Sequence, residues 1–401
     1  MSHVASPAGS APRRPLASYV VGSTGLRRPS ADAWRTAGIT VACVAIAMAL
    51  AALLVTLTDG SPSEVVDALY TGSTADAAGW SQTLVNAAPL LLVALGACIA
   101  NRAGVFNIGQ EGQLLIGAMV GCFVALRLQG PGWLVITLAL AASAAGGGAW
   151  SGISAAMYYT RGVNVVVTTL LLTFIAAQVV QFAVLRPWLL QETGIGNGPA
   201  RPQSDAVPEY LRLASFGHYP DLSIGVGIIL AVVATVVLAV LLGRSRWGFR
   251  INMLGFNPLA ARHAGIRASW LGGSALVLSG AFAGLAGGVI LLGTVFRLQP
   301  AISNNFGWDG LLVALVARSR PGLALPVAVL FGGLRAGSSF LASTGVPDYL
   351  VDVIQALLVL AFVVPPVLSA LWGRRIRNRS AAPDSPARPE AAAPAKEEVP
   401  V

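Results

Sequence analysis

Long apolar stretches recur along this chain, and they limit its possible folds more than any other feature. About 20 consecutive apolar residues are enough for a helix to cross the hydrocarbon core of a bilayer. Of the 401 residues, 55% are hydrophobic and only 11% are charged, which is less than half of the ~25% charged share of soluble domains. We therefore expect an all-α polytopic membrane bundle rather than a set of soluble domains.

Ten candidate spans can be identified between the polar ends of the chain. They cover residues 37–58, 82–101, 108–127, 133–157, 164–186, 222–243, 269–292, 307–317, 322–342 and 350–372. The eighth span is too short to cross alone, so it is tilted, broken or re-entrant, and an arrangement of eight spans with re-entrant segments is the alternative. Ten spans would divide into two inverted halves of five, although no convincing internal sequence similarity accompanies them.

The basic residues set the expected orientation, because cytoplasmic loops carry an excess of Arg and Lys. With ten spans, most of the 26 basic residues fall on one side, and the other side collects acids such as Glu64 and Asp205. Both termini are therefore expected in the cytoplasm. The net charge of +9 then reflects membrane topology and not nucleic-acid binding. Residues 1–36 and 373–401 have the composition of disordered segments, which leaves 37–372 as the membrane domain.

The chain offers little for catalysis or for ATP binding. His3, His218 and His263 are far apart and form no HExxH motif, and the three cysteines have no metal-site spacing. A P-loop needs Gly-Lys followed by Ser or Thr, whereas the only lysine, Lys396, follows Ala395. We expect a transport protein with no catalytic residue, metal or cofactor of its own. Any ATP and Mg²⁺ would be bound by a partner.

A cluster of amides and one carboxylate lies between the second and third spans. If residues 107–121 are helical, Asn107, Gln110 and Glu111 share one helix face. Polar groups in such a place cost free energy and therefore need a role. One interpretation is a buried polar knot that fixes the bend between two helices, with Glu111 favoured by the helix dipole and accepting from Arg102. The other is a lining of the solute path, and the two can coexist.

Two further polar stretches mark the fifth and eighth spans. Asn164 and Thr168 align at i, i+4 spacing, and the hydroxyl either bonds back to the preceding turn or faces a path. Asn305, Trp308 and Asp309 lie at the mouth of the short eighth span, where an aromatic–acid pair suits a polar solute. The alternative makes Trp308 an interfacial anchor and Asp309 a helix-start acid.

Two other patterns within the spans concern packing. Small residues recur at four-residue spacing, which lets helices approach closely in lipid. The simpler alternative is that membrane helices are generally rich in glycine. The residues at this spacing are Gly280, Gly284 and Gly288 in one span and Gly117 and Gly121 in another. Arg335 lies within the ninth span, where a charge is costly, so we expect it to be paired or to extend toward the interface.

The loop 244–268 carries five arginines and no acid. Asn257 suits an N-cap and Pro258 the first helical position, and Gly265 suits the C′ position. These residues predict a short helix over 258–264 on the cytoplasmic face, which an ATPase could push. The alternative is a basic loop lying on anionic lipid. The residues of the expected coupling helix and its caps are Asn257, Pro258, Ala260, Ala261, Arg262 and Gly265.

Taken together, several runs resemble the permease subunits of bacterial ABC importers of the nucleoside and simple-sugar type. This superfamily includes ribose and branched-chain amino acid permeases. The runs are NRAGVFNIGQEGQLLIGA, GVNVVVTTLLLTFIA, GFRINMLGFNPLAARHAGI, LSGAFAGLAGG, FGWDGLLVALVARSRP and GVPDYLVDVIQALLVL. They cover most of residues 84–366 in the expected order, and the closest likeness is to the nucleoside branch. Thr173, where many relatives have Asn, and the Arg318–Arg320 turn, where a Gly-Arg pair is expected, depart from the pattern.

The resemblance implies a second permease chain, a cytoplasmic ABC ATPase and an extracytoplasmic substrate-binding lipoprotein, assembled in the bacterial cytoplasmic membrane. It places the ATPase contact on Asn257–Gly265, and the outer loop 187–221 is long enough to dock a partner. We expect ATP-driven import of a neutral polar solute by alternating access, with nucleosides first and ribose-type sugars as the alternative. The rival class is an ion-coupled transporter, for which only Glu111 and Asp309 offer intramembrane carboxylates.

Overall fold

The computed structural model describes residues 61–193, 201–217 and 222–343, with some positions between 38 and 56 and between 353 and 361. The segments 1–36 and 373–401, which are expected to be disordered, lie outside the described residues. The first and last expected spans are covered only in part.

The described residues form a polytopic helical bundle, as the hydropathy predicts. Six of their helices are long and apolar enough to cross a membrane, and each falls on an expected span. They are α3 (Ala77–Arg102), α5 (Gly132–Arg161), α6 (Val165–Val184), α7 (Val226–Arg244), α10 (Ala268–Ile290) and α12 (Pro321–Ser343). A π-helical turn, η3 (Leu291–Val295), continues α10.

Shorter elements connect and cover these helices. Two of them, α4 (Gln110–Arg127) and α11 (Phe306–Val316), fall on the expected third and eighth spans. The others are α2 (Pro62–Ser73), α8 (Arg246–Phe256), α9 (Pro258–His263), η2 (Glu209–Leu211) and a two-stranded hairpin of β1 (Ser215–Phe216) and β2 (Ile224–Gly225). The hairpin is antiparallel and pairs Ser215 with Gly225 and Phe216 with Ile224.

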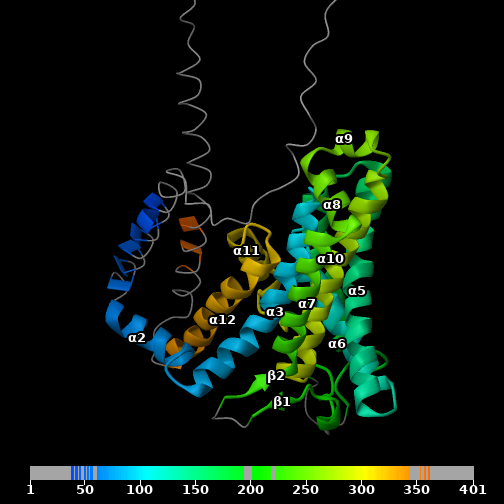
Figure 1. Cartoon of the computed structure of the whole chain (residues 1–401). Coiled ribbons are helices and arrows are strands. Elements are labelled where there is room, and N and C mark those ends of the chain that lie inside the picture. The colour runs from blue at the N-terminus through cyan, green and yellow to red at the C-terminus, as the bar shows by residue number, and fades with distance from the viewer. Residues whose placement is uncertain are drawn as a thin grey trace, which may run out of the picture.

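The bundle has two ends that carry different elements. In Figure 1, α8 and α9 lie at one end, here called the α9 end, and β1 and β2 lie at the opposite end, the hairpin end. Helix α3 connects them: Leu84 lines a cavity together with Ser215 of β1, whereas Arg102 is so close to α8 that a Cβ on Gly255 would lie 2.1 Å from its carbonyl oxygen.

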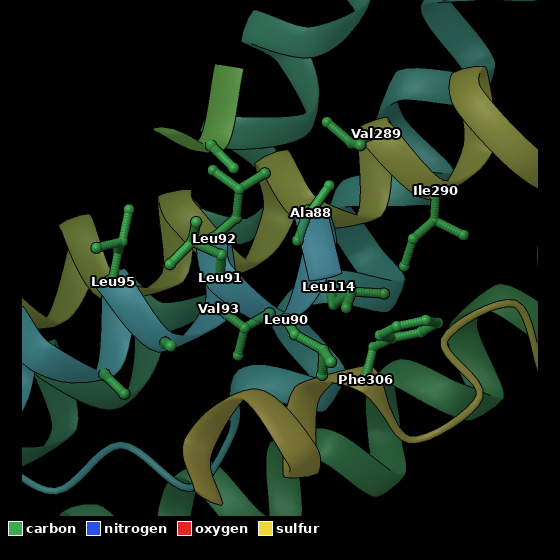
Figure 2. Packing of buried hydrophobic residues seen from close by; sticks show 14 of the residues in the cluster. Ala88, Leu90, Leu91, Leu92, Val93, Leu95, Leu114, Val289, Ile290 and Phe306 are labelled. Carbon is green, nitrogen blue, oxygen red and sulfur yellow. The ribbon is translucent and has the colours of Figure 1, made fainter. Parts of the chain in front are cut away.

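Helix α3 lies at the centre of the bundle. Every residue from Ala87 to Ala100 is buried, which is the pattern of a helix that is covered on all sides. Figure 2 shows Leu90 and Val93 of α3 with Leu114 of α4 and Phe306 of α11 nearby. Helix α11 therefore packs along α3 from its middle, and α4 reaches the same part of α3 near its own start.

Small residues bring α4, α5 and α10 into close contact, as their spacing predicts. A Cβ on Gly117 would lie 2.3 Å from the Cα of Gly284, and a Cβ on Gly147 would lie 2.4 Å from the carbonyl oxygen of Gly280. The matching stripe on α5 consists of Ser143, Gly147 and Ser151, which also repeat every four residues. The sequence analysis did not name this stripe, although its spacing is the same.

Candidate functional site

Helices α4 and α11 both begin inside the bundle, beside the middle of α3. The side-chain amide of Gln110, the first residue of α4, donates to the carbonyl oxygen of Val93 at 2.9 Å. Gly310, in the first turns of α11, contacts the same residue, because a Cβ there would lie 2.5 Å from the Cβ of Val93. Val93 belongs to the central part of Ala77–Arg102, so both short helices start well away from either end of the bundle.

From this starting point the two helices run in opposite directions. Helix α4 ends at the hairpin end, where Arg127 donates to the carbonyl oxygen of Trp188 at 3.3 Å. Helix α11 ends at the α9 end, where Asn101 donates to the hydroxyl of Ser319 at 3.1 Å. The short eighth span is therefore a half-helix, which agrees with the expectation that it is too short to cross alone. Half-helices whose N-termini lie at mid-depth are a common basis for solute sites in transporters.

The start of α4 contains a buried hydrogen-bond network. Asn107 donates to Gln113 at 2.9 Å and to Ser279 of α10 at 3.0 Å, and its side-chain oxygen accepts from Gly109 N and from Gln113, each at 3.1 Å. Asn107, Gln110 and Gln113 are at most 2% exposed. This arrangement is the polar knot of the first interpretation. Gln113 and Ser279 complete it, and the sequence analysis missed both of them.

Glu111 connects the two half-helices. Its side chain is 7% exposed, and its Oε2 accepts from the backbone N–H of Gly307 in the first turn of α11 at 2.7 Å. The carboxylate therefore lies in the first turn of one helix while it caps the N-terminus of another, and both helix dipoles favour its negative charge. Arg102 is engaged elsewhere, because its Nε donates to the carbonyl oxygen of Ser319 at 3.0 Å.

The start of α11 contains an ion pair, as expected for Arg335. Its guanidinium pairs with the carboxylate of Asp309, donates to the carbonyl oxygen of Asn304 at 2.6 Å and lies 4.1 Å from the ring centroid of Phe306. Both charged side chains are 16% exposed. The two charges neutralise each other beside the N-terminus of α11.

Accessible polar groups surround this ion pair. Asn304 and Asn305 are exposed, and Trp308 is half-buried. Both asparagines adopt the left-handed backbone region, with φ of 38° and 64°, which Asn tolerates better than most residues. Of the expected path residues around the two half-helices, Asn305, Trp308 and Asp309 therefore have accessible surface, whereas Asn107, Gln110 and Glu111 are enclosed by the protein.

The remaining path candidates, Asn164 and Thr168, serve the start of α6. Asn164 caps this helix by accepting from Val166 N at 2.9 Å. The hydroxyl of Thr168 is buried and lies within hydrogen-bond distance of the carbonyl oxygens of Asn164 and Val165, as in the local interpretation. The threonine nearest the start of α4 is instead Thr169, since a Cβ on Gly109 would lie 2.8 Å from its carbonyl oxygen.

A repeated motif at the two helix starts could have revealed their relation. Gly109-Gln110-Glu111-Gly112 opens α4, and Gly307-Trp308-Asp309-Gly310 opens α11. The second glycine of each motif packs tightly, Gly112 against Thr173 of α6 and Gly310 against Val93 of α3. In both helices, the motif therefore places a carboxylate in the first turn between two glycines.

The short helix predicted in the basic loop is present as α9. The side-chain oxygen of Asn257 accepts from Leu259 N and Ala260 N, each at 3.0 Å, and Gly265 has a φ of 76°, as expected at the C′ position. Ala261 is fully buried, whereas Leu259 is 64% exposed. Helix α9 therefore rests on the bundle by one side and presents an apolar side chain, together with the exposed Arg262, outward.

Long apolar helices with two half-helices that meet at mid-depth define a multi-pass transport protein. Residues 79–363 match the family described as the permease component of the branched-chain amino acid transport system. The chain belongs to this permease family. It is thus a transport subunit of the ABC type, not an enzyme, in the bacterial cytoplasmic membrane.

Relatives with named functions are similar over most of their length. The chain is 33% identical to the glucose ABC transporter permease protein TsgB13 of Haloferax volcanii, over 84% of this chain and 89% of the relative. It is 30% identical to the guanosine ABC transporter permease protein NupP of Bacillus subtilis, over 81% and 93%. It is 27% identical to the nucleoside ABC transporter permease protein NupB of Lactococcus lactis, over 76% and 84%. No solved structure matches the chain.

Proposed function

We propose that this chain and a second permease chain form the membrane path of an ATP-driven importer for nucleosides. A cytoplasmic ATPase that binds ATP and Mg²⁺ would drive it, and an extracytoplasmic binding lipoprotein would deliver the solute. Ribose-type sugars are the alternative. The names of NupP and NupB favour nucleosides, and the name of TsgB13 favours a sugar.

The observation that carries this proposal is the chemistry at the start of α11. Asp309 and Arg335 are paired there, and Glu111 is buried behind the first turn, so the accessible surface offers amides and an aromatic ring without a net charge. Such a surface suits a neutral solute with hydrogen-bonding groups. The ring of Trp308 can stack on a base, an interaction worth about 1–3 kcal/mol where it has been measured in nucleic-acid complexes.

This chemistry divides the expected path residues into two roles. Asn305, Trp308 and Asp309 would face the solute, and Asn107, Gln110 and Glu111 would hold the two half-helices in place. Asn164 and Thr168 would shape the start of α6. The enclosed hydrogen bonds at the start of α4 support this assignment, because they leave its amides no solvent contact.

The proposed orientation puts the α9 end in the cytoplasm. Arg102, Arg161 and Arg244 end α3, α5 and α7 at this end, which agrees with the excess of basic residues on the cytoplasmic side of membrane proteins. Ten spans within 37–372, with both termini in the cytoplasm, complete the proposed topology. Helix α9, with Asn257, Pro258, Ala260, Ala261, Arg262 and Gly265, would then contact the ATPase.

The solute assignment can be tested by uptake of labelled uridine, adenosine, ribose and glucose in cells with and without the gene. Loss of nucleoside uptake alone is expected. Trp308→Ala should lower nucleoside uptake about tenfold at equal abundance, and Trp270→Ala, at a tryptophan that is 70% exposed elsewhere, serves as the control. Loss of sugar uptake alone would show that the transported solute is a sugar and not a nucleoside.

The coupling assignment needs a separate test. Replacing residues 258–264 with a Gly/Ser linker should leave ATP hydrolysis by the complex but abolish uptake, with the chain still present in the membrane. Unchanged uptake would remove α9 from the coupling role. Uptake that depends on the proton gradient and not on ATP would instead favour the ion-coupled class.

A further inference from the structure

A basin of about 430 Å³ opens at the α9 end and is lined by three arginines and no carboxylate. It lies where three segments meet: the end of α3, the end of α8 and the turn between α11 and α12. The side chains that line it and carry hydrogen-bonding groups are Asn101, Arg102, Asn252, Arg318, Ser319 and Arg320.

Contacts between distant segments fix the shape of this basin. Asn101 donates to the hydroxyl of Ser319 at 3.1 Å, and the Nε of Arg102 donates to its carbonyl oxygen at 3.0 Å. Gly255 of α8 packs on Arg102 so closely that a Cβ would lie 2.1 Å from the carbonyl oxygen. The basin is therefore built by tertiary contacts and is not a chance gathering of side chains on one loop.

The basic groups of the basin are not neutralised by the part of the chain that the structure describes. Arg102, Arg318 and Arg320 form no salt bridge with any described residue, although three other arginines do. Arg318 and Arg320 are exposed and Arg102 is half-buried. Three guanidinium groups around one opening, without a carboxylate partner among the described residues, make a strongly anion-attracting site.

The turn that carries two of these arginines has an unusual backbone. Arg318 and Ser319 have φ of 52° and 54°, in a left-handed backbone region that residues other than Gly, Asn and Asp rarely adopt. The N–H of Ser319 donates to the carbonyl oxygen of Ala314 at 2.8 Å, which holds the turn. Glycine would adopt this conformation without strain, so the turn holds the Arg318 side chain at the basin at some cost in backbone strain.

We infer that this basin binds a phosphate group, either from the headgroup of an anionic phospholipid or from a free phosphate. Planar guanidinium groups match phosphate oxygens in geometry and charge. A phosphate bound there would join the α11–α12 turn to the end of α8, the helix that leads directly into α9. The phospholipid source requires the α9 end to lie at a membrane surface, which a membrane-spanning bundle provides in either orientation. Phosphate binding itself does not require it.

The test uses the full chain purified with its partner subunits in a non-ionic detergent. Its melting temperature is followed during titration with phosphatidylglycerol, with a diacylglycerol that lacks phosphate, and with inorganic phosphate against chloride at equal ionic strength. We expect phosphatidylglycerol to raise the melting temperature and diacylglycerol to leave it unchanged. A rise with inorganic phosphate would identify a free phosphate as a sufficient ligand.

The decisive variant is Arg318→Gln/Arg320→Gln, which should weaken the apparent affinity roughly 30-fold. Arg161→Gln/Arg267→Gln removes two exposed charges at the same end outside the basin and should respond like the natural chain. If the first variant folds poorly, Arg318→Gly/Arg320→Gln keeps the turn without strain. Equal responses in all variants, or no response to either phosphate source, would overturn the inference. Loss of ATPase binding without a phosphate response would also overturn it and make the basin a protein contact.

Discussion

The two helices that begin inside the bundle open with the same pattern, Gly-x-Glu/Asp-Gly, yet their carboxylates have different partners. Glu111 of α4 is 7% exposed and accepts from Gly307 N of α11. Asp309 of α11 is 16% exposed and pairs with Arg335 of α12. The start of α4 is closed by neighbouring side chains, whereas the start of α11 leaves Asn304 and Asn305 exposed.

The difference shows how a side chain of one half-helix can satisfy the N-terminus of another and leave the other side of that helix accessible. The first N–H groups of any helix lack partners within the helix, and inside a membrane protein an unsatisfied group is costly. Glu111 accepts a hydrogen bond from one such group of α11, the N–H of Gly307. The accessible side of α11 is therefore free to interact with a solute. We propose that the start of α4 acts as support and the start of α11 as the functional face, and the following experiments test this division.

The largest effect is expected where the two starts touch. A Cβ on Gly307 would lie 2.4 Å from the Cα of Glu111 and 2.5 Å from its N, and backbone atoms cannot move aside cheaply. Gly307→Ala should therefore destabilise the fold by about 3 kcal/mol or more and sharply lower the abundance of folded chain. Gly322→Ala is the control, because nothing lies within 4 Å of a Cβ there. Equal abundance of the two variants would contradict the close contact.

A smaller effect is expected from removal of the supporting carboxylate. Glu111→Ala leaves the N–H of Gly307 without its acceptor, and an unsatisfied buried group costs about 1–3 kcal/mol. Glu111→Gln keeps an acceptor oxygen and should fall between Glu111→Ala and the natural chain in melting temperature. The supporting role predicts that uptake per folded molecule falls less than abundance does. Normal abundance together with lost uptake would move Glu111 to the solute path.

The opposite pattern is expected for the carboxylate of α11. Asp309→Asn leaves the charge of Arg335 without its ionic partner, which should cost about 1 kcal/mol of stability for this partly exposed pair and give the accessible surface a net positive charge. We expect near-normal abundance and lower uptake of a neutral solute. The double variant Asp309→Asn/Arg335→Gln restores neutrality and should recover part of the uptake. No recovery would mean that Asp309 contacts the solute directly.

Part of this comparison could be predicted from the sequence and part could not. The spans follow from local hydropathy, and α9 follows from the caps Asn257 and Gly265, because such signals depend on neighbouring residues only. The bond between Glu111 and Gly307 joins residues 196 positions apart, so no local pattern reveals it. Helix α8 was not predicted, because the basic and polar residues Arg246, Arg250 and Asn252 interrupt its apolar residues and give the segment the composition of a loop.

The segments that precede the two helix starts give the last and smallest test, because only the segment before α11 is held by an acidic side chain. Asn107 anchors the segment before α4 through neutral hydrogen bonds. The segment before α11 is anchored at the hairpin end, where Leu298 N donates to the hydroxyl of Ser204 at 2.9 Å and Arg297 pairs with Glu192. Hydrogen bonds from Gln203, and then from Arg297, hold the pKa of Glu192 below its usual value.

The direction of this shift determines the expected pH dependence. Because the pKa of Glu192 is lower in the folded chain, its contribution to stability is complete above the ordinary value of about 4.3 and is lost as pH falls through the folded pKa. Glu192→Gln should therefore lower the melting temperature slightly at pH 7 and have less effect near pH 3. Asp205, which accepts from Thr193, remains in both proteins. It therefore cancels in the difference between them. If the difference in melting temperature does not change with pH, the ion pair adds nothing to stability. The hydrogen bond from Leu298 N to the hydroxyl of Ser204 would then be enough to hold the segment that leads to the start of α11.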